Sequence, residues 1–166
     1  MLSGGSAGHI TLGCIKRMAT LGKAIEIAAR VYVDRVYGDE ASPYVLHSLA
    51  VMHHASAWGD SRRSIVAVLH AAVEERRVSI DELKNQGFSS DVIEALQILP
   101  RRDGESAVEC ARRVSVNEIA SSVKLVNAAV HMNEDYAGGT MMDAATKLEY
   151  SEVKAILTSH GRRNAP

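Results

Sequence analysis

Residues 65–75 read IVAVLHAAVEE, and this stretch decides the fold. Its apolar side chains fall on nearly every side of a helix, a pattern that is typical of a helix buried at the centre of a protein. Asp60 or Ser61 can cap the start of that helix, because a short oxygen-bearing side chain accepts a hydrogen bond from a backbone N–H at a helix start. We therefore expect a central, buried helix here.

Helical spacing continues on both sides of this segment. Apolar residues recur every three or four positions, whereas the alternation typical of a half-buried strand is scarce. Ser79 and Glu82 fit a capping box that opens a short helix ending at Gly87. The other expected helices cover residues 15–37, 43–58, 89–99, 105–113, 116–132 and 140–160.

The sequence thus predicts an all-α fold, a single compact bundle of about seven or eight helices. The bundle is expected over residues 15–160, between a loose tail at 1–14 and a frayed tail at 161–166. Two adjacent glycines break the chain before the last helix, which Thr140 and Asp143 are expected to cap.

Composition argues against several classes of partner. The 166 residues carry a formal net charge of -1 and only one Trp, one Phe and five Tyr. A neutral, aromatic-poor chain offers neither the basic surface nor the stacking platforms that extended nucleic acid requires. No run approaches the roughly 18 apolar residues of a membrane span. The Gly/Ser-rich start is unlike a signal peptide. With Cys14 and Cys110 standing alone, we expect a cytoplasmic protein with reduced thiols and no membrane partner.

The order and spacing of several segments resemble a known family. The segments are KAIEIAARVYV (23–33), PYVLHSLAVM (43–52), IVAVLHAAVEE (65–75), SIDELKNQGFSSDVIEALQILPRRDGES (79–106) and VKLVNAAVHMN (123–133). Together they resemble the small HD-domain proteins related to the hydrolase domain of the RelA/SpoT enzymes. The resemblance implies an all-helical HD architecture around a divalent metal ion, often Mn²⁺. It also implies hydrolysis of phosphate groups, such as the 3′-pyrophosphate of the alarmone (p)ppGpp.

The metal ligands of this family are only partly present. The resemblance assigns ligand positions to His47 and His70, which are kept, and to two aspartates, which are replaced by Ala71 and Asn127. A hard dication that activates water favours carboxylate oxygens. Ala71 supplies no ligand, and Asn127 supplies only a neutral carbonyl oxygen. We therefore expect a Mn²⁺ site formed by His47, His70 and Asn127 to be weak or absent.

Other residues could compensate for the lost carboxylates. Glu74 lies one helical turn after His70, and His54 lies two turns after His47, each on the same helix face. The resemblance implies that the acidic pair Glu74 and Glu75 helps to activate water, whereas the structural alternative is a solvated turn with Arg76 and Arg77 as neighbours. A structural role as a hydrogen-bonded core residue is the alternative for His54 and for its neighbour His53.

A pair of arginines forms a second candidate site. Arg101 and Arg102 stand in a polar turn before a helix, where two guanidinium groups could bind phosphate. The alternative is a solvated turn. Arg113 is expected on a helix surface, and His131 is displaced from the family pattern, so that the resemblance gives it no role.

Three functions remain open on the sequence alone. The favoured hypothesis is a non-catalytic or weakly active binder of a phosphate-bearing nucleotide or of a regulatory partner. The alternative is an active metal-dependent phosphohydrolase with a rewired site. The third is a structural bundle that forms a homo-oligomer through apolar helix faces.

Overall fold

The computed structural model describes residues 18–37, 42–132 and 143–161. Within these residues the chain forms eight α-helices, so the prediction of an all-α bundle with seven or eight helices is confirmed. They are α1 (Leu21–Val31), α2 (Val45–Ala55), α3 (Ser61–Glu74), α4 (Ile80–Gln86), α5 (Ser90–Ile98), α6 (Ala107–Val114), α7 (Glu118–Met132) and α8 (Ala144–Gly161). A short 3-10 helix, η1 (Ser56–Trp58), follows α2.

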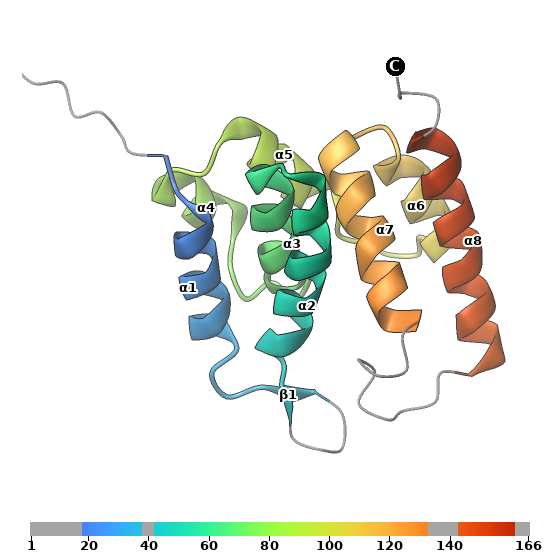
Figure 1. Ribbon diagram of the computed structural model, residues 1–166, viewed down its shortest axis with the longest axis horizontal. Helices are drawn as coiled ribbons and strands as arrows, with labels where there is room; N and C mark the ends of the chain where they lie inside the picture. Colours follow the sequence, from blue (N-terminus) through green and yellow to red (C-terminus); the bar gives the residue numbers. More distant parts are fainter. Residues whose placement is uncertain (1–17, 38–41, 133–142, 162–166) are drawn as a thin grey trace, which may run out of the picture.

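The helix α3 lies at the centre, as the sequence predicts. Every residue from Ser64 to Val73 is buried. This helix packs against α1, α2, α5 and α7 (Figure 1). The expected cap is also present, because Asp60 accepts a hydrogen bond from the backbone N–H of Arg62. None of the helices in the described part of the chain combines the length and the apolar character that a membrane crossing requires.

The first helix is shorter than predicted. It begins after Thr20, whose hydroxyl accepts a hydrogen bond from the backbone N–H of Lys23, and it ends at Val31 rather than at residue 37. After α1 the backbone no longer forms helical hydrogen bonds. The carbonyl oxygen of Arg35 accepts a hydrogen bond from the N–H of Tyr44, and the strand β1 (Val36–Tyr37) pairs antiparallel with β2 (Ser42–Pro43). Residues 31–37 are rich in β-branched and aromatic side chains, which disfavour a helix. The predicted extension was wrong for that reason.

Helix capping differs from the prediction at two places. Ser79 accepts from the N–H of Glu82, but the Glu82 carboxylate binds Arg30 instead of completing the box. The complete capping box is formed by Ser106 and Glu109 at the start of α6. The predicted start at residue 105 was therefore early, because the side chain of residue 105 is used in another contact described below.

The last helix, α8, lies at one edge of the molecule against α6 and α7 (Figure 1). Asp143 caps it by accepting a hydrogen bond from the N–H of Thr146, as predicted, while Thr140 lies outside the described residues. Its buried residues, Val153 and Leu157, belong to a small apolar cluster separate from the main core. The helix α8 thus packs beside α7 through this small cluster.

Candidate functional site

Three imidazoles from three helices meet next to the central helix. The ring centroid of His47 in α2 lies 5.8 Å from that of His70 in α3 and 4.7 Å from that of His131 in α7. His47 and His70 are both buried. His131 was missed by the sequence analysis, although it stands four residues after Asn127 and therefore on the same face of α7.

His47 and Asn127 form a hydrogen bond with each other. Nε2 of His47 lies 3.1 Å from Oδ1 of Asn127, and both residues are buried. Because an amide oxygen only accepts, the hydrogen lies on Nε2 of His47 and this nitrogen has no lone pair to offer a metal. Two positions that the resemblance assigns to metal ligands are thus joined by a direct hydrogen bond.

The tautomer of His70 is fixed by its own helix. Nδ1 of His70 lies 2.6 Å from the carbonyl oxygen of Ala67, so Nδ1 donates and the lone pair lies on Nε2. Ala71, next to it, is buried and offers no donor atom. A single imidazole lone pair is a poor donor set for a hard dication, which favours several oxygen ligands.

The described residues do not fit the metal ion that the resemblance implies. Across 18–37, 42–132 and 143–161, no three His, Cys, Asp or Glu side chains are grouped so that they could hold one. The two residues expected to compensate do not join His47 and His70 in such a group. His54 is exposed, as is His53, and it lines a separate hollow with Val126, Ala129 and Val130. Glu74 binds a lysine instead.

Burial keeps His47 and His131 uncharged. Loss of water lowers the pKa of His47 to about 3, and the neighbouring His70 and His131 act in the same direction. Burial is also the largest cause of the lowered pKa of His131. Glu74 acts in the opposite direction on His131, but burial outweighs it, so the rings of His47 and His131 are neutral at pH 7.

The stability of the protein should therefore depend on the protonation of His47. Its pKa is lower in the folded state than the value near 6.5 of an unfolded chain, so folding is favoured above that pH and loses free energy as the pH falls towards 3. The expected slope is up to about 1.4 kcal/mol per pH unit. His47→Gln keeps a donor for Asn127 but does not titrate. Urea unfolding between pH 6.5 and 4.5 should give a flatter pH dependence for His47→Gln, whereas parallel curves would contradict this assignment.

The acidic pair at the end of α3 is divided between two environments. Glu74 lies 3.3 Å from Nζ of Lys124 on α7. Glu75 turns the other way, with Arg35 and Arg77 each 3.0 Å from its carboxylate. Glu75 is thus neutralised by arginines, the alternative reading of the sequence, and only Glu74 stands at the cavity described next.

A cavity of about 320 Å³ lies between α7, α8, the end of α3 and the turn after α5. Its lining residues are Glu74, Pro100, Arg101, Ala107, Cys110, Lys124, Asn127, Ala128, His131, Glu149, Tyr150 and Val153. The lining thus contains two cations and two carboxylates. The Tyr150 ring lies 5.4 Å from the ring of His131. Asn127 and His131 belong both to this cavity and to the imidazole group.

The two arginines of the polar turn have different roles. Arg101 lines the cavity, but Arg102 does not. The backbone N–H of Arg102 donates instead to the carboxylate of Glu105 at 2.9 Å. Arg113 was expected on a helix surface, yet its side chain is only 16% exposed and binds this same turn. No spacing rule marks an ion pair between residues eight positions apart, so this contact could not be predicted from the sequence.

Comparisons with known proteins leave the family open. No family model matches the chain, and no curated protein matches its sequence. The HD-domain resemblance therefore stays a prediction that rests on the sequence segments quoted above.

Proposed function

We propose that this chain is a metal-independent binding domain of HD-like architecture. Its ligand is a small phosphate-bearing molecule, a nucleotide in the favoured case, bound in the cavity beside α7 and α8. The observation that carries this proposal is the hydrogen bond between His47 and Asn127. Because these two groups satisfy each other, the interior is stable without a cation between them.

Two cationic side chains support a phosphate ligand. Lys124 is held at the cavity by its contact with Glu74, and its side chain is 17% exposed. Arg101 reaches the same cavity from the turn after α5. An ammonium group has three donors and a guanidinium group has five, so both can form charge-assisted hydrogen bonds with phosphate oxygens.

The two carboxylates that line the cavity favour a ligand that carries hydroxyl or amino groups as well as phosphate. Glu74 and Glu149 are acceptors, so beside a phosphate bound by the two cations they can accept hydrogen bonds from hydroxyl or amino groups of the ligand. The volume lies near the lower end of small-molecule sites, which span roughly 300–1,000 Å³. A compact nucleotide satisfies both conditions, whereas an extended nucleic acid is too large for this volume.

Hydrolysis is not expected from these groups. The lost carboxylates leave no donor set for an ion that would lower the pKa of water. Glu74 is the member of the acidic pair that stands at the cavity, and it is paired with Lys124. The rewired hydrolase therefore becomes one outcome of the test below rather than a second proposal.

Inorganic pyrophosphate is a suitable probe, because it presents the phosphate group alone and reports both binding and cleavage. In excess EDTA, its ³¹P resonance should broaden or shift on addition of the protein. Orthophosphate release, assayed separately with millimolar Mn²⁺, should stay at the level of a protein-free control. Mn²⁺-dependent release that disappears in His70→Ala would identify an active hydrolase and contradict the proposal.

A further inference from the structure

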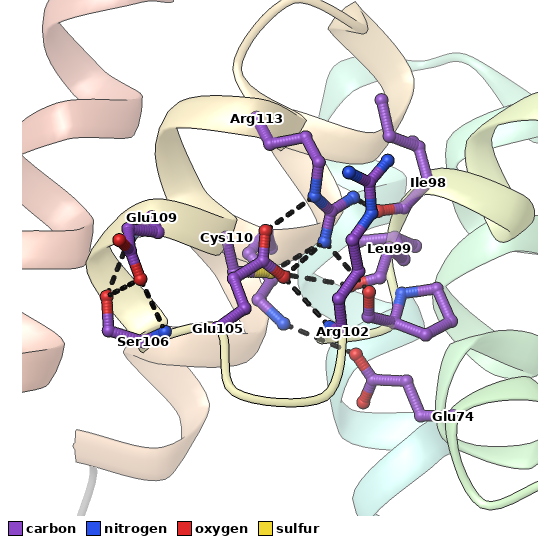
Figure 2. Close-up of polar contacts among 11 residues, drawn as sticks. Glu74, Ile98, Leu99, Arg102, Glu105, Ser106, Glu109, Cys110 and Arg113 are labelled. Carbon is purple, nitrogen blue, oxygen red and sulfur yellow. Dashed lines mark hydrogen bonds and ion pairs between the residues drawn. The ribbon is translucent and has the colours of Figure 1, made fainter.

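The turn between α5 and α6 is closed by one part-buried ion pair. Nε and Nη2 of Arg113 each lie 2.7 Å from an oxygen of the Glu105 carboxylate, a bidentate arrangement (Figure 2). The two side chains are only 16% and 12% exposed. The hydrogen bonds from Arg113 are the largest cause that lowers the pKa of Glu105 to about 2. The pair therefore stays charged over the whole physiological pH range.

The same guanidinium also binds the end of α5. Nη2 of Arg113 donates to the carbonyl oxygen of Pro100 at 2.9 Å, and Nη1 donates to the carbonyl of Ile98. Carbonyl groups at a helix C-terminus lack partners within the helix, so a cation there is favourable. On the other side of the turn, Glu105 accepts the N–H of Arg102 (Figure 2).

These contacts bind the backbone on both sides of Arg101. The carbonyl before it, from Pro100, and the N–H after it, from Arg102, are both bound to the Arg113–Glu105 pair. The backbone on each side of Arg101 is thus fixed, while its own side chain lines the cavity. No other cation from this turn is among the cavity-lining residues of the described chain.

We propose that Arg113 and Glu105 are positioning residues, which hold the turn so that Arg101 presents its guanidinium to the anionic group of a ligand in the cavity. This inference rests on the proposed function. Fixing the backbone before binding reduces the entropy lost when Arg101 engages the ligand. Without the pair, affinity should fall by roughly 3- to 10-fold, the effect of one side chain that must be ordered on binding.

A double-mutant cycle separates positioning from general support of the fold. Calorimetric titration with pyrophosphate in EDTA would compare Arg113→Met, Arg101→Ala and the double variant. Arg113→Met should weaken binding in the parent protein and have no further effect once Arg101 is removed. Arg112→Met, which removes an equal charge from the exposed neighbouring position, serves as the matched control and should bind as the parent does.

Two results would overturn the inference while the proposed function stands. One is an equal loss of affinity from Arg113→Met with and without Arg101, since the pair would then act only through the fold. The other is unchanged affinity in Arg101→Ala. If Arg113→Met fails to fold, Glu105→Gln tests the same coupling with a smaller change of shape. Absence of pyrophosphate binding by the parent protein would overturn the proposed function and the inference together.

Discussion

Replacing Ala71 and Asn127 together by aspartate should create a Mn²⁺ site of micromolar affinity where the parent protein has little or none. Ala71 adjoins His70 in the sequence, and Oδ1 of Asn127 lies 3.1 Å from His47. The double variant would restore both carboxylates beside two imidazoles, the donor set that the HD resemblance implies. Loss of even an outer-shell partner costs about 10- to 100-fold in affinity, so restoring two direct ligands should gain at least that much.

Calorimetry with chelator-stripped protein would measure this gain, and a third substitution, His70→Ala, should abolish it. Ala71 is 3% exposed, so an aspartate there buries a carboxylate and should lower the melting temperature in EDTA. Mn²⁺ should then raise that temperature in the double variant alone. A folded double variant that binds no metal would contradict the assignment of these four positions to the HD pattern.

Removal of the Lys124 charge should reduce pyrophosphate affinity by about 10- to 100-fold in Lys124→Met, the range for a hydrogen bond to a charged group. The loss has two parts. One donor disappears, and Glu74, whose carboxylate lies 3.3 Å from Nζ in the parent, then faces the ligand without its cation. Lys154→Met removes an equal charge from an exposed position on α8 that does not line this cavity, and it should have no effect.

Glu74→Gln should act in the opposite direction. A neutral amide no longer competes with phosphate for Lys124, so calorimetry should show tighter binding, by a factor of about 2 to 5 for a partly exposed charge pair. A hydrolase would instead lose turnover when its general base is removed. Weaker binding in Glu74→Gln would count against the binding of phosphate by Lys124.

The central part of the fold could be predicted from the sequence, but some element ends could not. The segment around Ile65–Val73 is apolar on all sides and has a capping residue before it, so burial and helix start followed directly. The end of α1 reflects both the β-branched and aromatic residues that follow it and the antiparallel pairing between residues 36–37 and 42–43, which helical spacing does not reveal.

Only those residues of the site to which the family resemblance assigns a position could be predicted. His47 and Asn127 were expected to be neighbours and are hydrogen-bonded. The cavity also depends on Lys124 and Tyr150, and on which sides of α7 and α8 face each other, which spacing within one helix does not reveal. The cytoplasmic location and a homo-oligomeric state stay predictions from the sequence.

Titration of the parent protein with pyrophosphate in excess EDTA tests the central claim most directly. Metal-independent binding predicts a saturable heat with one site per chain in EDTA, strongly reduced in Lys124→Met. Binding that occurs only with Mn²⁺, or no binding under either condition, would contradict it.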